Sequence, residues 1–364
     1  MTSTLLNQPP PEIGLDDTSN LLPAFLVRLS NESLDIKPNT EYDPLDISLP
    51  QNLIETGSDH DLSISLELSK SEAEPILLET WTSRCTVVAV DVSSIRIGET
   101  SAGTLCALRG AVVWRKSGEY GYTRCGPLIF HLTDATIHSI FQRLGFSSAL
   151  SAPDIPLANR VLGRLRNALE RWIQSSVCQS FKDSLILLDG SLTAGTPDNP
   201  VKPIESMLDT ARRNQDMVLA ISKSTKLRLM GNDITQLTEH INSACLIDVD
   251  SAVRRSFPSY PMQLLGRIFV AKLLQKGFSF RLDVDREIDR DTAIASIRRL
   301  MGSDIVSQGY PETLRLAHIL STFTANEVIG IQSFLHGRHG LRAEPSFNLR
   351  RSLFGPYGSS WEAS

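Results

Sequence analysis

The chain has 364 residues, of which 41% are hydrophobic and 21% charged, with a formal net charge of −5. These values are ordinary for a soluble globular protein with room for one large domain or two. No apolar run is long enough to span a membrane, and the first residues lack the basic and apolar regions of a signal peptide, so we expect a cytoplasmic protein.

The charge is divided unevenly along the chain. Residues 1–80 hold 15 acidic residues and 3 basic ones, so the remainder holds 26 acidic and 33 basic residues. A basic body is typical of nucleic-acid binding, although basic residues also cover ordinary solvated surfaces. The five cysteines are scattered without CxxC spacing, which favours reduced thiols over disulfides or a zinc cluster.

Composition predicts three regions: an acidic, partly ordered extension at 1–80, the main domain at 81–340, and a basic flexible tail at 341–364. Within the extension, apolar patches predict a short helix at 21–29 and a strand at 61–68. The first patch is either a docking element or part of the internal packing; it contains Leu21, Leu22, Phe25 and Leu26.

The main domain begins with three predicted strands, a helix and a second, long helix. Short turns join the strands into an antiparallel meander. Periodicity and capping residues predict strands at 86–91, 102–114 and 121–132, and helices at 135–144 and 157–180. The elements expected after these are strands at 185–188, 217–221, 267–274 and 278–283, and helices at 204–214, 234–243, 291–301 and 312–335.

Two of the predicted strands run into an aspartate. Leu185 to Leu188 form an apolar run that ends at Asp189, and Val87 to Val90 run into Asp91. Such runs are typical of strands buried on both faces, and ligands in open α/β sheets lie outside the strand ends. Two carboxylates at neighbouring strand ends predict a divalent-metal site, although Asp189-Gly190 is also a common turn.

The order of elements is that of an α/β protein with a ribonuclease H-like fold. This fold has a mixed five-stranded sheet flanked by helices, with the first and fourth strands side by side. Here we also expect further strands and helices towards the C-terminus. The order would place Asp91 beside Asp189, as the predicted metal site requires.

Acidic and basic residues of the other elements extend this site. Glu170 lies at the edge of the apolar stripe of the helix at 157–180, where it is either a solvated edge residue or an acid leaning over the strand ends. Three arginines on another face of this helix are candidates to bind DNA: Arg160, Arg164 and Arg171. Lys223 follows the strand at 217–221 and either binds a phosphate or is an ordinary loop lysine.

Several stretches of the chain resemble the NurA nuclease family. They are VVAVDVSS at 87–94, the helix with Glu170 ahead of LILLDGSL, AISKS at 220–224, and GYPETLRLAHIL at 309–320. The resemblance extends from about Cys85 to the C-terminus. It implies that 81–340 is a nuclease domain with Asp91, Glu170, Asp189 and His318 as metal-binding and catalytic residues.

The resemblance also implies an activity and partners. Family members are manganese-dependent DNA nucleases of double-strand break end resection, with exonuclease activity (5′–3′ is our prediction) and single-strand endonuclease activity. They form homodimers and act with the hexameric ATPase HerA. Magnesium is an alternative metal, because carboxylate and imidazole ligands suit both ions. Without the resemblance, His318 is more readily interpreted as a core histidine among leucines.

Two alternatives to a nuclease remain. One follows from a departure from the family pattern, and the other from a feature shared with a different class of enzyme. The family usually has glycine where this chain has Val92, and valine does not readily adopt a positive φ, so we expect the turn after Asp91 to differ. This leaves open a catalytically inactive scaffold that docks on the ATPase. Actin-like ATPases and sugar kinases also place aspartates at strand ends, but they need two related halves and glycine-rich phosphate loops, which this sequence lacks.

Overall fold

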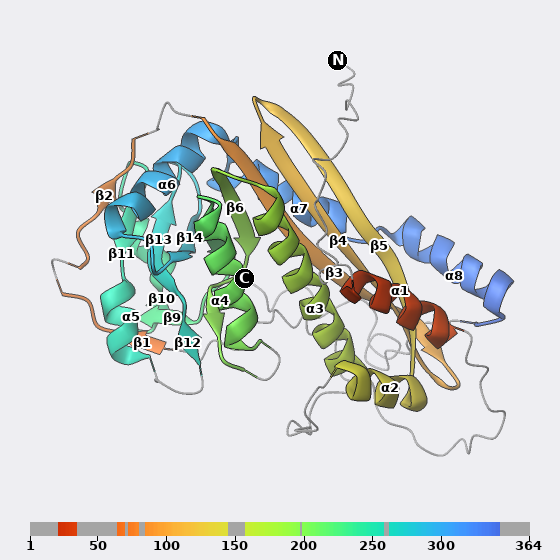
Figure 1. The fold of residues 1–364 in the computed structure, drawn as a ribbon. Coiled ribbons are helices and arrows are strands. Elements are labelled where there is room, and N and C mark those ends of the chain that lie inside the picture. Colours follow the sequence, from red (N-terminus) through yellow and green to blue (C-terminus); the bar gives the residue numbers. More distant parts are fainter. Residues whose placement is uncertain are drawn as a thin grey trace.

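The computed structural model describes residues 21–34, 64–69, 72–79, 84–144, 157–196, 199–257 and 262–342. They form a mixed α/β fold in which one large sheet is flanked by helices (Figure 1). The nine strands of this sheet follow the order β2-β11-β13-β14-β8-β6-β3-β4-β5. Within these ranges, no helix combines the length and apolar character needed to cross a membrane.

The elements have the following bounds. The large sheet contains β2 (Ile76–Leu77), β3 (Thr86–Thr100), β4 (Gly103–Lys116), β5 (Glu119–Thr133), β6 (Ser184–Asp189), β8 (Met217–Ser222), β11 (Cys245–Asp248), β13 (Gly266–Lys272) and β14 (Ser279–Asp285). Smaller sheets contain β1 (Ile64–Leu66), β7 (Thr193–Ala194), β9 (Leu227–Leu229), β10 (Asn232–Asp233), β12 (Gln263–Leu264), β15 (Val306–Ser307) and β16 (Tyr310–Pro311). The helices are α1 (Leu21–Leu34), α2 (Asp134–Leu144), α3 (Leu157–Ser180), α4 (Val201–Arg213), α5 (Asp250–Ser256), α6 (Arg290–Ser303), α7 (Glu312–Ser321) and α8 (Ala325–His339), with a 3₁₀ helix at Ile234–Thr238.

Five of the nine strands have the predicted ribonuclease H-like order. β3, β4 and β5 form an antiparallel meander, while β6 and β8 run parallel to β3. The first and fourth strands of this set, β3 and β6, are direct neighbours, which confirms the expectation from the sequence. Four further strands extend the sheet beyond β8: β14, β13, β11 and β2.

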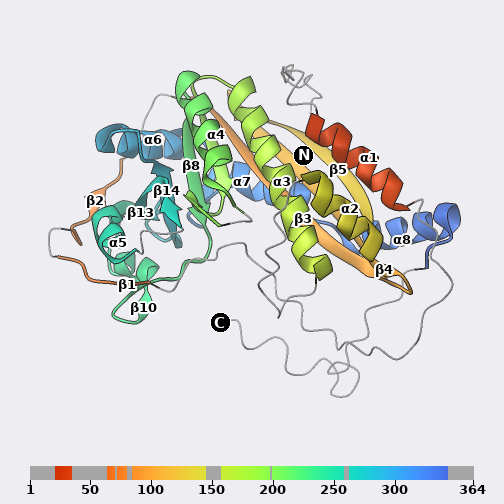
Figure 2. The same cartoon turned by 60° about the horizontal axis from the view of Figure 1, so that its bottom comes forward.

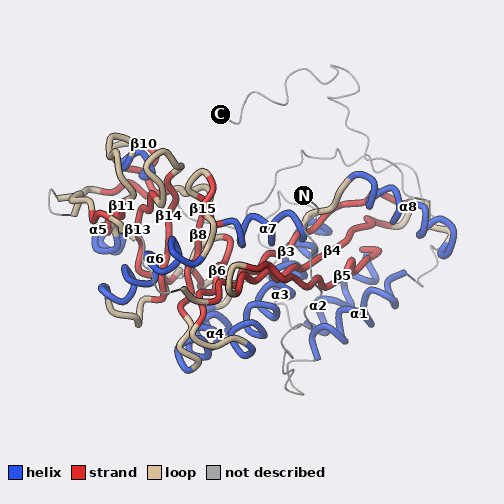
Figure 3. Tube along the Cα trace, turned by 90° about the horizontal axis from the view of Figure 1, so that it is seen from above, coloured by secondary structure: helices blue, strands red, loops and turns tan. Residues whose placement is uncertain are grey.

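The two faces of the sheet are covered by different helices (Figures 2 and 3). Successive side chains of a strand point to opposite faces, so β3 contributes to two hydrophobic cores. Val88 and Val90 pack in the core that includes residues of α1, α2, α3 and α4. Val87 and Ala89 pack in the core formed with α6 and α7. Burial on both faces explains why β3 and β6 read as unalternating apolar runs.

Parts of the acidic extension pack against the main domain. The predicted helix and strand are present as α1 and β1, β1 pairs in parallel with β9, and β2 pairs with β11. In α1, Leu26 is fully buried in the core, so this leucine belongs to the internal packing and not to a docking surface. The division into regions 1–80, 81–340 and 341–364 stays a prediction, and residues 343–364 of the tail lie outside the described residues.

Some predicted elements differ from the structure. The helix expected at 234–243 is only the 3₁₀ helix, and the helix expected at 312–335 is two helices, α7 and α8, because a new N-cap at Thr324 starts the second one. α6 begins at Arg290, one residue before the predicted start at 291, because Asp289 caps it. β11 and α5 were not predicted, since seven or fewer residues carry little periodicity.

Candidate metal centre at two neighbouring strands

The two aspartates lie side by side where β3 and β6 separate. β3 pairs with β6 up to Val90↔Leu188, so the next residue of each strand is an aspartate, Asp91 in one and Asp189 in the other. Both occupy odd positions, on the α7 face of the sheet. The sequence predicted that β3 ends at Asp91, but it continues to Thr100 because its hairpin with β4 carries on beyond β6.

His318 and Ser321 of α7 approach the same carboxylate. His318 Nδ1 lies 3.3 Å from Asp91 Oδ2, and the Ser321 hydroxyl donates a hydrogen bond to that oxygen. Ligand atoms of Asp91, Asp189 and His318 all lie within 4.8 Å of one another. The structure thus brings together three of the four residues predicted to bind metal. The imidazole is about half exposed, so His318 is not the core histidine that its leucine neighbours suggested.

The three groups influence one another's protonation. Burial by itself would raise the pKa of Asp91, but the hydrogen bonds from His318 and Ser321 outweigh it and hold this pKa below its usual range. The hydrogen bond to Asp91 in turn raises the pKa of His318. Burial raises the pKa of Asp189, and the charge of Asp91 adds to this effect, while Lys223 opposes it. A bound cation would stabilise the charged forms of these two neighbouring, largely buried carboxylates.

Lys223 supplies a positive charge at the edge of this cluster. It directly follows β8, and its Nζ lies 2.7 Å from Asp189 Oδ2. The same Nζ lies 5.7 Å from the ring centroid of Tyr310. The lysine predicted to bind a phosphate therefore lies at the strand ends, within reach of a group bound to the carboxylates.

Glu170 lies on α3, which packs on the face of the sheet opposite to that of Asp91 and Asp189. Its Oε1 accepts a hydrogen bond of 3.0 Å from Gln174. Burial raises the pKa of Glu170, the arginines Arg171 and Arg166 lower it, and the charges of Asp91 and Asp189 raise it further. Its carboxylate is not among the three groups that converge within 4.8 Å. Its position fits an outer role, such as orienting a water molecule, better than direct ligation.

Gly110 of β4 lets α3 come close to the sheet at this point. A Cβ on Gly110 would lie 2.2 Å from Cδ1 of Ile173, which is one turn from Glu170. The glycine is also the β4 partner of Val92, the residue after Asp91. A side chain at this position would require Ile173 to move, so the glycine accommodates the packing of the helix that carries Glu170.

The three arginines of α3 have different environments. Arg164 is buried, with its guanidinium 5.4 Å from the ring centroid of Phe141, so burial argues against the expected role of Arg164 in lining a DNA channel. Arg171 donates hydrogen bonds to Gln174 and Asn199. Arg160 is partly exposed. A DNA contact by Arg160 or Arg171 stays a prediction.

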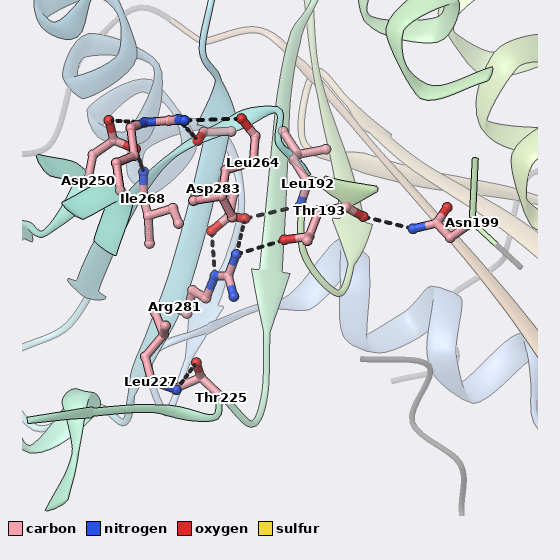
Figure 4. A network of polar contacts seen from close by, with 12 residues as sticks. Leu192, Thr193, Asn199, Thr225, Leu227, Asp250, Leu264, Ile268, Arg281 and Asp283 are labelled. Carbon is pink, nitrogen blue, oxygen red and sulfur yellow. Dashed lines mark hydrogen bonds and ion pairs between the residues drawn. The ribbon is translucent and has the colours of Figure 1, made fainter. Parts of the chain in front are cut away.

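The loop after Asp189 is fixed by a buried ion pair (Figure 4). Asp283 Oδ2 accepts a hydrogen bond of 3.0 Å from the Leu192 amide, and Arg281 donates one of 3.2 Å to the Thr193 hydroxyl. Arg281 and Asp283 are each 1% exposed and bind one another through two hydrogen bonds of 2.9 Å. This pair fixes the backbone that leaves the metal centre.

Sequence reasoning missed two residues of the site. Tyr310 lies in β16, directly before α7, and its hydroxyl is buried without a hydrogen-bond partner among the described residues. Its ring centroid lies 5.7 Å from Lys223 Nζ, and burial and the charges of Asp189 and Asp91 raise the pKa of this phenol. Ser321 follows His318 by three residues, so helical spacing was a signal for its place on the same face.

The structure has similarities to solved nucleases, although no family model and no curated protein matches the sequence. The NurA nuclease from Sulfolobus solfataricus is 17% identical, with a TM-score of 0.48 over 74% of this chain and 89% of that one. Human ENDOV is 11% identical, with a TM-score of 0.36 over 86% and 98% of the two chains. A NurA structure with dAMP and manganese is 9% identical, with a TM-score of 0.37 over 72% and 90%. Because all three scores are below 0.5, we base the proposed function on the geometry of the site.

Proposed function

We propose that this chain is a metal-dependent nuclease that hydrolyses phosphodiester bonds of DNA. The observation that supports it is the convergence of Asp91, Asp189 and His318 within 4.8 Å at the ends of two paired strands. A basic group, Lys223, is in contact with the same cluster. Carboxylates next to a lysine combine a metal site with a counter-charge for phosphate, which are the two requirements of phosphodiester hydrolysis.

The donor atoms fit a divalent cation. Two carboxylates and one imidazole form a mixed oxygen and nitrogen set, which suits Mn²⁺ as well as Mg²⁺, and we propose Mn²⁺ as the working ion. A bound cation would supply an activated water and charge neutralisation at the phosphorus.

The chain's own residues have distinct roles in this proposal. Asp91, Asp189 and His318 hold the cation, and Ser321 fixes the Asp91 carboxylate through its hydroxyl. Lys223 exchanges its contact with Asp189 for a phosphate oxygen when DNA is bound. Glu170 orients the attacking water from the α3 side.

The sequence resemblance to the NurA family extends this proposal to a biological setting. On that basis we propose 5′–3′ exonuclease and single-strand endonuclease activity, in the cytoplasm, in DNA double-strand break end resection. We further propose a homodimer that acts with a HerA-type hexameric ATPase. Mass measurement of the purified chain tests the homodimer. Co-purification with such an ATPase tests the second interaction.

The nuclease is tested by cleavage of an end-labelled single strand with Mn²⁺, with Mg²⁺ and with EDTA. We expect metal-dependent cleavage by the wild type and a loss of roughly a thousandfold or more in Asp189→Asn. Asp183→Asn is the matched control, because Asp183 directly precedes the other end of β6 and its side chain is 66% exposed. Cleavage that survives in Asp189→Asn, or that persists in EDTA, would overturn the proposal.

An inactive scaffold is the second candidate, and its support in the sequence is Val92. Val92 lies within β3, is paired with Gly110, and is 6% exposed. It is not among the described residues with positive φ, and β3 continues through this position, so no turn follows Asp91. No metal-dependent cleavage by wild type, alone or with the ATPase, would make the scaffold the better function.

A further inference from the structure

A pocket of about 330 Å³ adjoins the metal centre on the side of β14. It shares two residues with that centre, His318 of the metal cluster and Lys223 at its edge. Its volume is in the range of small-ligand sites. The pocket is lined by Lys223, Phe278, Phe280, Ser307, Gln308, Tyr310, Arg315 and His318.

Its aromatic wall is held by a close backbone contact. The Phe278 amide donates a hydrogen bond of 2.8 Å to the Gln308 carbonyl. Gly309 has a φ of 91°, and a Cβ there would lie 2.6 Å from the Phe278 carbonyl oxygen. The turn between β13 and β14 is therefore fixed against the β15–β16 hairpin, and only glycine at 309 permits this contact.

The wall exposes aromatic surface beside the carboxylates. Phe278 is 67% exposed, although it lies on a fixed turn and not at a chain end. Phe280 packs edge-on against Tyr310, with ring centroids 5.3 Å apart. The Tyr310 hydroxyl has no hydrogen-bond partner among the described residues. An exposed ring on a fixed turn, in line with a wall of packed aromatic residues, is a surface that a flat ligand would cover.

Positive charge lines the same pocket. Lys223 contacts Asp189, and Arg315 is paired with Glu312 on the exposed surface of α7. Aromatic rings with basic groups are the combination by which proteins bind single-stranded nucleic acid: bases stack on the rings, and Lys and Arg meet the phosphates.

We propose that this pocket binds the unpaired base of the nucleotide next to the scissile phosphate. The base stacks on Phe278, and Lys223 and Arg315 meet the phosphate backbone. A base in a duplex is stacked and paired, so it must leave the duplex before it enters. The pocket thereby selects single strands and frayed ends. This inference deepens the proposed nuclease function and rests on it.

Binding without cleavage tests the pocket. The probe is a short fluorescent DNA single strand in EDTA, followed by anisotropy, together with strands in which one abasic residue is moved along the sequence. We expect one abasic position to weaken wild-type binding roughly tenfold, since stacking on one aromatic residue is of that size. Phe278→Ala should bind the intact strand roughly tenfold more weakly and lose its sensitivity to the abasic residue.

Two further variants separate the pocket from general effects. Phe278→Trp should keep the abasic effect, because it retains the aromatic face. Phe334→Ala is the matched control, since Phe334 is another exposed phenylalanine, 48% exposed, on α8. Its binding should equal that of the wild type.

The outcomes distinguish the pocket from the nuclease. Metal-dependent cleavage without any abasic effect, or Phe278→Ala with wild-type binding, overturns the pocket and leaves the nuclease intact. An abasic effect that depends on Phe278, in a protein that does not cleave DNA with any metal, supports the pocket and overturns the nuclease. Absence of single-strand binding by wild type overturns the pocket.

Discussion

Lys223 forms a contact with a carboxylate that we propose binds the cation, since its Nζ lies 2.7 Å from Asp189 Oδ2. A lysine in this place opposes cation binding by charge repulsion and also lowers the pKa of Asp189, against the effect of burial. It thus has opposite effects on the two ligands of the site, the metal and the DNA phosphate. These effects can be separated by removing the charge and keeping the length of the side chain.

Lys223→Met should bind Mn²⁺ more tightly and DNA more weakly. Loss of a repulsion of about 1 kcal/mol would raise Mn²⁺ affinity roughly fivefold. Titration calorimetry with Mn²⁺ and anisotropy with DNA measure the two changes. Lys226→Met is the control, because Lys226 is exposed on the same loop without a contact to the cluster. Weaker Mn²⁺ binding in Lys223→Met would contradict this account.

The residues of the site were predictable to different degrees. Asp91 and Asp189 follow apolar runs that mark buried strands, and strand order placed them together. Nothing in the periodicity distinguished His318 from a core histidine, and only the family resemblance selected it. Phe278 and Tyr310 line one pocket because two turns approach closely at Gly309, and no local pattern reveals such an approach.

At the scale of a single strand, Val92 explains why β3 continues beyond Asp91. Its side chain packs in the core on the α3 face, opposite to the face of Asp91, and it pairs with Gly110. A valine in the interior of a buried strand stabilises it through burial and restricted backbone freedom.

Val92→Gly should therefore destabilise the protein by about 2–4 kcal/mol, because both burial and strand propensity are lost. We expect no gain of nuclease activity per folded molecule, although glycine is usual here in the family that the sequence resembles. Urea unfolding and a cleavage assay measure the two quantities. Increased cleavage in the glycine variant would show that valine distorts the site.

The buried pair Arg281–Asp283 couples β14 to the loop after Asp189. Removing one partner of such a pair leaves an uncompensated charge, which typically costs about 3–5 kcal/mol. Arg281→Met should lose about this much stability, and cleavage should fall because the backbone at Leu192 and Thr193 loses its anchors.

The rescue variant Arg281→Met/Asp283→Asn tests the cause of this loss. Asparagine keeps an acceptor for the Leu192 amide without a buried charge, so the double variant should recover more than half of the lost stability in urea unfolding. A double variant no more stable than Arg281→Met would show that packing, and not the buried charge, dominates.

At the scale of the whole molecule, the sheet is larger than the sequence predicted. The five-stranded ribonuclease H-like part and the hairpin β13–β14 could be predicted from apolar runs and turns. Their union into one nine-stranded sheet was not predictable, since β14 pairs with β8 over 58 residues of intervening chain or more. Long-range antiparallel pairing carries no local signal, and β2 and β11 are too short to be recognised.

The stability of the whole fold should depend on pH through Asp216. Burial, with the nearby charge of Asp183, raises the pKa of Asp216 from 3.8 to about 6, although the Ser184 amide donates a hydrogen bond to it. The raised pKa means that the folded state binds this proton more tightly than the unfolded chain. The contribution of this proton to the free energy of unfolding is complete below pH 3.8 and is lost as the pH rises through about 6.

Asp216→Asn should remove this dependence. Relative to the wild type, the variant should gain up to about 3 kcal/mol of unfolding free energy between roughly pH 4 and pH 8. Urea unfolding over this range measures the difference. Asp291→Asn, at an exposed carboxylate, should follow the wild type. A constant difference between Asp216→Asn and wild type would contradict the assignment.

The most direct test of the central claim, that Asp91, Asp189 and His318 form a divalent-metal centre, is the binding of Mn²⁺ itself. Electron paramagnetic resonance measures free Mn²⁺ during titration of wild type, Asp91→Asn, Asp189→Asn and the control Asp183→Asn. We expect wild type and Asp183→Asn to bind alike, and the other two variants to bind at least roughly tenfold more weakly, because each loses a charged oxygen ligand. Equal binding by all four proteins, or no binding by wild type, would contradict the account.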